Sequence, residues 1–498
     1  MAETVQTKHH LYTEHLADWQ KLKDAYKGER QVKSKGTVYL PATSGMIADG
    51  ITNTSSKGYQ QYLAYLGRAV FPEFFVESVN TNMGMLWYKD PVIKVPKQLE
   101  PLIERASVKG ETLKQLYRRV NEAQLTTGRC GLLLDLPREV PTGTPVLPYI
   151  AMYDTESIIN WDDGGVGSPT MQTLNLVVLD ESGMRRTGFT WEQKDRFRVL
   201  YLGEELSNEV VGTYHARVMA ADETDIEAPI TPMYAGKTLD QIPFVFINSK
   251  DLLPDPDVPP LLSLANLCMT IYRGEADYRQ NLFMQGQDTL VIVGSESADE
   301  AIRIGANATL HLPIGGSAEY IGVNSKGLAE QRLALENDRR TAASRSGQLV
   351  DTTSRQRESG DALSTRVAAQ TATLNDIAIT AAGGLERILK MAATWVGADP
   401  EEVSVKPNLD FVNVQMTSRN IVELQTAKGL GAPISQETIH DIMAQRQLTR
   451  KTFEEELAAI KKEEPLVEPE ETATGGNDVG AGKQAGSQGG NGRGTSGV

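Results

Sequence analysis

The 498-residue sequence has few cysteines and no long apolar run, and each shortage excludes a class of protein. Its two cysteines, Cys130 and Cys268, lie far apart and form no CxxC pair. A disulfide-rich scaffold and a thiolate zinc site are therefore excluded. Apolar runs such as Phe244–Ile247 are far shorter than the ~20 residues that cross a membrane. Met1–His10 lack the apolar segment of a signal peptide. We therefore expect a soluble protein of a reducing, intracellular compartment.

Positive charge is also in short supply. The 50 Lys and Arg residues stand against 65 Asp and Glu, which gives a net charge of −15. This balance argues against coating nucleic acid by bulk attraction, because such binding requires many neutralised phosphates. An acidic protein can still handle DNA through a local basic patch, or by enclosing it without binding it tightly. The stretch from Lys21 to Lys35 carries a local charge of +4, which is typical of a solvated face or arm.

The sequence contains no complete catalytic motif. Gly236-Lys237-Thr238 resembles the end of a phosphate-binding loop, but Thr231 stands where the first glycine of that loop is needed. His10 and His15 fall ~140° apart around a helix, so they are poorly placed to share a metal ion. No GxSxG nucleophile turn occurs. We therefore expect no enzyme activity, no catalytic residue, no cofactor and no metal.

The first half of the chain predicts an α+β body behind a polar N-terminal segment. Residues 1–60 are polar and irregular, apart from a helix expected over His9–Tyr26, and are interpreted as an arm. Helical spacing of apolar residues follows over Tyr59–Trp87 and Leu113–Thr127. Short apolar runs separated by turn residues predict strands at Gly128–Asp135, Leu174–Leu179, Phe189–Glu192, Phe197–Leu202 and Pro243–Ile247.

The centre of the chain predicts two long helices around a small module. The first helix is expected over Pro260–Gln285, 26 residues or ~39 Å. The second is expected over Leu328–Ser346. Between them the sequence predicts a βαββ module with strands at Thr289–Val293, Ala308–Leu312 and Ala318–Val323 and a helix opened by a capping box at Ser297–Glu300.

A third long helix begins at Asp361 and carries one apolar stripe as far as Trp395. The Gly383-Gly384 pair falls inside this helix, where glycine is unfavourable, so we expect a kink there. A smaller helical region is expected over Ile421–Ile460. Thr472–Val498 are rich in Gly, Ser and Ala and predict a disordered tail.

In this order of elements, the chain resembles the portal proteins of tailed bacteriophages over about residues 60–460. The residues that carry the resemblance flank the helix–module–helix centre on both sides, and they are Phe71–Phe74, Asn82–Pro91, Thr127–Pro137, Gly360–Ser364 and Trp395–Gly397. The resemblance implies an α+β, portal-like fold. Its parts would be an N-terminal arm (1–60), wing (61–257), first stem helix (258–287), clip (288–327), second stem helix (328–347), tunnel loop (348–361), long wing helix (362–409), crown (410–464) and disordered tail (465–498).

The same resemblance implies a function in the virion. Portal proteins form a homo-oligomer of twelve subunits at one capsid vertex, assembled in the host cytoplasm, through which double-stranded DNA is packaged and later ejected. The resemblance implies that the clip docks the terminase large subunit and then the tail adaptor, or head-completion protein, and that major capsid and scaffolding proteins are further partners. Because the packaging motor is a separate protein, the lack of a nucleotide site here agrees with this interpretation. Four clip residues are assigned to partner contacts from their position alone: Glu296, Asp299, Glu300 and Arg303.

Basic residues gather near the proposed tunnel. Five arginines, named at the end of this paragraph, and Arg366 give six positive charges. The acids Asp351, Glu358 and Asp361 leave a net charge of +3. Two interpretations stay open: some of these arginines contact DNA phosphates weakly and without sequence preference, or they pair with acids of a neighbouring subunit. The arginines proposed to lie near DNA are Arg339, Arg340, Arg345, Arg355 and Arg357.

Two other classes of protein remain as alternatives. One is a different oligomeric virion component, such as a head-closure or minor head protein. The other is an acidic cytosolic enzyme, which would need a pocket with convergent ionisable groups.

Overall fold

The computed structural model contains two compact units, Met1–Val412 and Asn413–Val498. The first unit mixes helices and antiparallel sheets, so the expected α+β class is confirmed. The residues that the structure describes are 4–137, 147–162, 174–203, 212–234, 237–286, 289–293, 312, 314–321, 327–346, 360–411, 425–445, 449 and 451–463.

The N-terminal segment packs on the body and contains the helix expected over His9–Tyr26, and residues 27–60 are more helical than expected. Its helices are α1 (His10–Tyr26), α2 (Glu29–Ser34), α3 (Ser44–Ala48) and the start of α4 (Lys57–Arg68). On α1, Trp19 and Leu22 share one face and are fully buried. The lysines of this segment lie at the surface beside acids, as Lys23 does beside Asp154 and Glu156. The segment therefore combines a buried apolar face with a solvated basic one.

Two antiparallel sheets contain four of the five expected strands, with ends shifted by at most two residues, and the fifth lies in a separate strand pair described below. A three-stranded sheet has the order β13-β2-β3, and its central strand is buried as expected. A five-stranded sheet has the order β10-β9-β8-β5-β4. Their bounds are β2 (Arg129–Asp135), β3 (Tyr149–Asp154), β4 (Ile158–Asp162), β5 (Leu176–Asp180), β8 (Phe197–Leu202), β9 (Tyr214–Met219), β10 (Asp225–Ile230) and β13 (Phe244–Asn248).

Helices cover the three-stranded sheet. They are α7 (Leu113–Thr126) and α10 (Gly360–Trp395), both within one residue of their expected bounds. The helical stretch expected over Tyr59–Trp87 is divided into α4 and α5 (Phe74–Leu86), and α5 packs against other helices. The helix α10 continues through the Gly383-Gly384 pair. At Gly384 it packs so closely on β13 that there is no space for a larger side chain. A Cβ on Gly384 would lie only 2.5 Å from Ile247 Cδ1. Beyond α10, β16 (Ser404–Lys406) pairs with β1 (Val92–Lys94).

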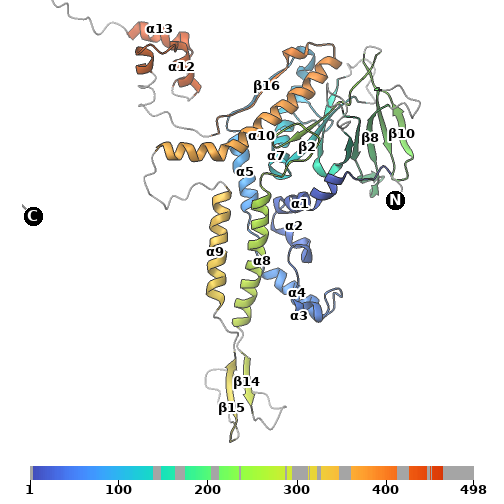
Figure 1. Cartoon of the computed structure of the whole chain (residues 1–498), viewed down its shortest axis with the longest axis vertical. Coiled ribbons are helices and arrows are strands. Elements are labelled where there is room, and N and C mark those ends of the chain that lie inside the picture. Colours follow the sequence, from blue (N-terminus) through green and yellow to red (C-terminus); the bar gives the residue numbers. More distant parts are fainter. Residues whose placement is uncertain are drawn as a thin grey trace, which may run out of the picture. The chain divides into compact units, whose positions relative to one another are not determined.

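A pair of helices and a hairpin form the centre of the chain (Figure 1). The helices are α8 (Leu262–Gln285) and α9 (Leu328–Arg345), each within two residues of expectation, and Gly286 caps α8. Between them in sequence, β14 (Thr289–Val293) pairs with β15 (Ser317–Ile321). The first strand matches the expectation, and the second begins one residue earlier than expected. The expected capping box at 297–300 and most of the strand expected at 308–312 lie outside the described residues.

Short elements complete the first unit: α6 (Glu100–Glu104), β11 (Met233–Tyr234), β12 (Lys237–Thr238), and the strands β6 (Gly183–Thr187) and β7 (Thr190–Lys194). Strand β7 corresponds to the strand expected at 189–192. The second unit contains α12 (Gln436–Gln445) and α13 (Phe453–Glu463), within the region expected to be helical. Residues 347–359 of the proposed tunnel loop and residues 464–498 lie outside the described residues.

Candidate functional site

Helices α8 and α9 lie side by side and run in opposite directions (Figure 1). The α8 helix has 24 residues, or ~36 Å of rise. Close approach is possible where Gly274 faces Leu335, since a Cβ on Gly274 would lie 3.1 Å from Leu335 Cδ2. Further along, Asn281 Nδ2 donates to Gln331 Oε1 at 3.1 Å. Apolar and polar contacts together make the pair one two-helix rod, called the α8–α9 rod below.

A buried carboxylate joins the two helices of the rod. The Glu275 side chain is 4% exposed and accepts hydrogen bonds from Arg279 Nε at 2.5 Å and from a terminal guanidinium nitrogen of Arg339 at 2.7 Å. A buried charge is stable only when opposite charges and hydrogen bonds compensate its lost hydration. The two arginines provide this compensation, one from each helix.

The α4 helix supports the C-terminal half of α8, the half that leads to β14. Tyr65 donates its hydroxyl to Asp277 Oδ1 at 2.5 Å. Burial, followed by the hydrogen bond to Asp277, holds the pKa of Tyr65 above its usual range. Arg68 donates to Gln280 Oε1, and its guanidinium carbon lies 4.2 Å from the centre of the Phe283 ring. These contacts hold α4 against the rod over Asp277–Phe283.

Much of α9 is left uncovered by the part of the chain that the structure describes. Of the 18 residues of α9, all of which the structure describes, Leu335 and Ala342 are buried. Large apolar side chains are exposed on both helices: Leu282, Phe283, Met284 and Leu333. A helix with so little burial gains little stability from packing, although α9 contacts both α8 and α5.

The arginines proposed to lie near DNA fall into two groups. Arg339 reaches Glu275 of the same chain. Arg340 and Arg345 are exposed on α9. Arg355 and Arg357 lie outside the described residues. The four residues proposed for clip contacts also lie outside them: Glu296, Asp299, Glu300 and Arg303.

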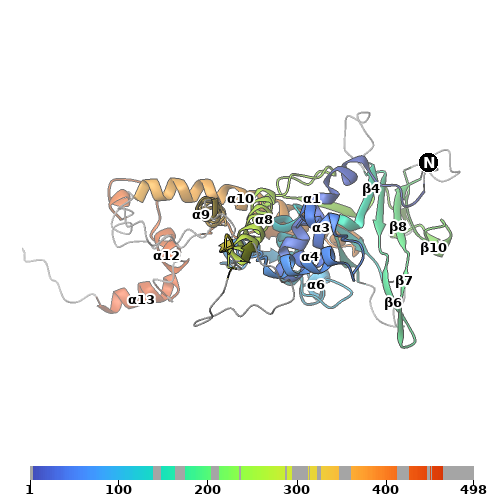
Figure 2. The ribbon, with the colours of Figure 1, turned by 90° about the horizontal axis from the view of Figure 1, so that it is seen from below.

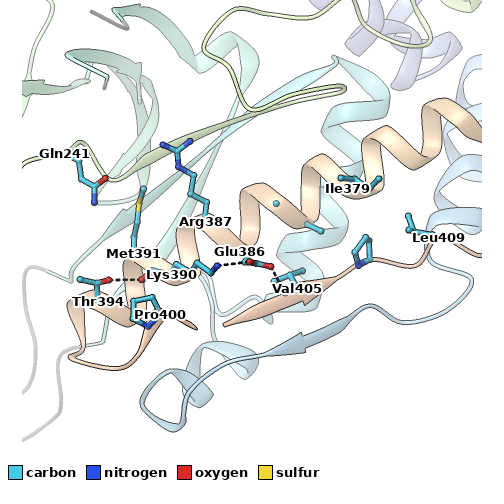
Figure 3. Close-up of a pocket in the computed structure, with 13 residues that line it drawn as sticks. Gln241, Ile379, Glu386, Arg387, Lys390, Met391, Thr394, Pro400, Val405 and Leu409 are labelled. Atoms are coloured by element: carbon cyan, nitrogen blue, oxygen red, sulfur yellow. Dashed lines mark hydrogen bonds and ion pairs between the residues drawn. The ribbon is translucent and has the colours of Figure 1, made fainter. Parts of the chain in front are cut away.

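A groove of about 640 Å³ lies beside α10 and β16 (Figure 3). On one side Glu386 accepts from Lys390 Nζ at 3.0 Å and from the Val405 N–H at 3.1 Å. Burial acts to raise the pKa of Glu386, but these two hydrogen bonds outweigh it and lower that pKa. Ile379 and Leu409 add an exposed apolar lining. A carboxylate whose pKa is lowered by an ion pair, as that of Glu386 is by Lys390, is poorly suited to act as an acid or base catalyst near neutral pH.

Within the described ranges, no group of three or more His, Cys, Asp or Glu side chains could hold a metal ion. None of the helices that the structure describes has both the length and the apolar character needed to cross a membrane.

Sequence reasoning missed the role of Arg129, which it placed inside a buried apolar strand. Its side chain is fully buried, and its guanidinium carbon lies 4.3 Å from the Trp161 ring centre and 4.5 Å from that of Phe246. It donates to the Pro254 carbonyl oxygen. Burial lowers the pKa of Arg129 to about 9. A charged residue within a run of Cys, Gly and Leu was the feature of the sequence that could have indicated a buried arginine.

Arg129 contacts the loop that precedes α8, the first helix of the rod. Its partner across the strand pair is Asn248, whose Nδ2 donates to the carbonyl oxygens of Leu253 at 3.0 Å and Asp255 at 2.6 Å. The adjoining Gly128 has a φ of +79°, and a Cβ there would lie 3.0 Å from Pro259 Cα. These contacts position the loop that leads into α8.

Comparison with known proteins gave the following results. A family model described as a domain of unknown function, DUF4055, matches residues 260–396, the segment from α8 to the end of α10. A search of curated proteins found no match. Among solved structures, a chain from the neck of a native gene transfer agent (GTA) particle computed with C12 symmetry is similar at 12% identity and a TM-score of 0.38, covering 74% of this chain and 88% of that chain. A chain from the neck of an empty GTA particle computed with C6 symmetry is similar at 12% identity and a TM-score of 0.39, covering 80% and 98%.

Proposed function

We propose that this chain is a portal protein, whose copies form a ring at one capsid vertex and enclose the channel for packaging and ejection of double-stranded DNA. The observation that carries the proposal is the α8–α9 rod with its strand pair between the two helices in sequence. In the resemblance to portal proteins, α8 corresponds to the first stem helix, the strand pair to part of the clip, and α9 to the second stem helix. The ring would consist of twelve subunits, and its clip would dock terminase and then the tail adaptor.

The exposed side of the rod supports assembly. Burying a large apolar side chain at an interface contributes about 1.5–3 kcal/mol to the free energy of association. Four such side chains stand exposed on the rod, and α9 has few buried residues of its own. In a ring, each rod would pack against the rods of two neighbours and cover these side chains. Rigid helices packed in this way suit a channel that must withstand the force of packaging.

The charge distribution supports weak contact with DNA. A channel that passes DNA in both directions must not bind it tightly, and roughly six to ten phosphate contacts would already add strong, salt-dependent affinity. The net charge of −15 opposes such binding. Arg340 and Arg345 are exposed on α9, while Arg339 is partly neutralised by Glu275. We therefore propose that Arg340, Arg345, Arg355 and Arg357 make the weak phosphate contacts.

Electron microscopy of the purified full-length chain tests the proposal. We expect ring-shaped particles with a central opening, and a native mass that is a multiple of the 54.5 kDa chain. Leu333→Asp places a charge on the exposed side of the rod and should convert rings to small species. Leu333→Met preserves size and polarity and should leave the rings intact. A monomeric wild-type chain, or particles without an opening, would contradict the proposal.

A further inference from the structure

The hairpin of β6 and β7 extends away from the rest of the first unit (Figure 2). Within the described chain, these two strands pair only with each other. Every residue from Met184 to Lys194 is exposed. A two-stranded hairpin on its own is at best marginally stable in water, so a partner would stabilise it.

The hairpin has one apolar-basic face and one polar face. Arg186 lies opposite Trp191, and Arg185 lies opposite Glu192, in an antiparallel register. Because side chains alternate between the two faces, Met184 shares a face with Arg186 and Trp191. The opposite face carries only small polar or charged side chains: Arg185, Thr187, Thr190, Glu192 and Lys194.

Apolar exposure on the first face is high. Met184 is 57% exposed, Trp191 is 62% exposed, and Phe189 at the turn is fully exposed. Single exposed apolar residues are ordinary, but three on one hairpin of twelve residues are an unusual concentration of exposed apolar side chains. Aromatic and arginine side chains together are the residues most often found at the centre of protein interfaces.

We propose that this face, Met184, Arg186 and Trp191 with Phe189 at the tip, docks on a second copy of this chain. Charge favours that occupant. Three basic residues and one acid give the hairpin a charge of +2, whereas the chain as a whole carries −15. Another copy of this chain therefore carries a net charge opposite in sign to that of the hairpin, which favours their association. The proposal rests on the proposed ring, which places a second copy beside each subunit, and it adds a contact separate from the α8–α9 rod.

Matched substitutions on the two faces provide the first test. Trp191→Ala and Arg186→Glu change the docking face. Arg185→Glu changes the opposite face and alters the net charge by the same amount as Arg186→Glu. Rings of the two docking-face variants should dissociate at protein concentrations about tenfold or more above that of the wild type. Rings of Arg185→Glu should stay within about threefold of the wild type. Equal effects of Arg186→Glu and Arg185→Glu would overturn the proposal.

Crosslinking identifies the partner directly. Phe189→Cys allows a benzophenone maleimide to be attached at the tip. The native Cys130 and Cys268 thiols are fully buried, and burial raises their pKa to about 12 and about 11, so the label reacts at position 189. Illumination of purified full-length protein should join two chains through this position. Rings that show no such crosslink would overturn the proposal and leave the proposed function standing.

Two further outcomes separate the two proposals. Crosslinked dimers from a protein that forms no ring would support the hairpin contact and contradict the proposed function. A label that joins a different protein in assembled virions, and never a second copy of this chain, would overturn the choice of partner.

Discussion

Glu275 of α8 and Arg339 of α9, 64 positions apart in the sequence, are joined by a 2.7 Å hydrogen bond inside the rod. The carboxylate also accepts from Arg279 one turn along its own helix. One buried acid thus takes a cation from each helix. The bond helps to fix how α9 lies along α8, and it engages Arg339, which the sequence analysis proposed to lie near DNA.

Removing Arg339 should destabilise the protein measurably. Arg339→Ala leaves the buried carboxylate with Arg279 alone. We expect the free energy of unfolding to fall by about 1–2 kcal/mol, at the low end for a charged hydrogen bond because the Arg339 side chain is 45% exposed. Arg340→Ala, on the same helix and exposed, should change it by less than about 0.5 kcal/mol. Urea denaturation of both variants measures the difference, and equal midpoints would contradict the assigned bond.

The two adjacent glycines of α10 should respond in opposite directions to alanine. A Cβ at Gly384 would lie 2.5 Å from Ile247, so Gly384→Ala should cost about 1–3 kcal/mol through overpacking. A Cβ at Gly383 would lie 3.7 Å from Leu252, an ordinary contact. Gly383→Ala should therefore stabilise the helix by up to about 1 kcal/mol. Thermal melting of the two variants checks the prediction, and destabilisation by both would refute it.

The contribution of Glu181 to stability should depend on pH. It accepts hydrogen bonds from Tyr153 at 2.7 Å, Arg196 at 2.8 Å and Arg198 at 2.6 Å. Burial acts to raise the pKa of Glu181, but the charge of Arg198 and these hydrogen bonds lower it overall. A lowered folded-state pKa gives stability that is complete above the unfolded value of about 4.3 and is lost as pH falls through the folded value.

Glu181→Gln tests this dependence. At pH 7 we expect the variant to be less stable than the wild type by about 1.5–3 kcal/mol, because charge-assisted hydrogen bonds are lost. The gap between the two proteins should shrink as the pH falls below about 4. Urea midpoints measured from pH 7 to pH 3 give the comparison. A gap that stays constant down to pH 3 would show that the carboxylate charge is not the stabilising feature.

Arg355 and Arg357 test the proposed DNA contact. If these side chains touch phosphates, Arg355→Ala with Arg357→Ala should shorten the packaged DNA or weaken its retention, while ring stability stays unchanged. The measurements are the length of packaged DNA and the mass of the isolated ring. Unchanged packaging with a weakened ring would instead assign these arginines to contacts between subunits.

The helix pair could be predicted from sequence because its signals are local. Apolar residues recur at helical spacing along α8, and Gly286 stands where the helix ends. The bounds predicted for strand β8, Phe197–Leu202, agree with the structure at both ends, because a short apolar run bounded by turn residues leaves little freedom in its ends.

Very short helices and features that depend on distant partners could not be predicted. In the N-terminal segment the expected helix over His9–Tyr26 is present as α1, but the short helices α2 and α3 were not predicted, because six and five residues are too few to show a helical period. The burial of Arg129 depends on Trp161 and Phe246, which lie far along the chain. The bond between Glu275 and Arg339 likewise requires knowing how α9 lies against α8. Tertiary packing, not local propensity, decides the last two of these cases.

The helix α10 takes part in two of the hydrophobic clusters of the first unit. Leu374 and Ile377 pack in the cluster that includes the rod, while Leu385 and Ile388 pack in the cluster beneath the three-stranded sheet. The backbone between these residues is unbroken helix. Mechanical strain at the base of the rod would consequently pass into the sheet along about three turns of hydrogen-bonded peptide, so the two regions would respond to an applied force as a single elastic body.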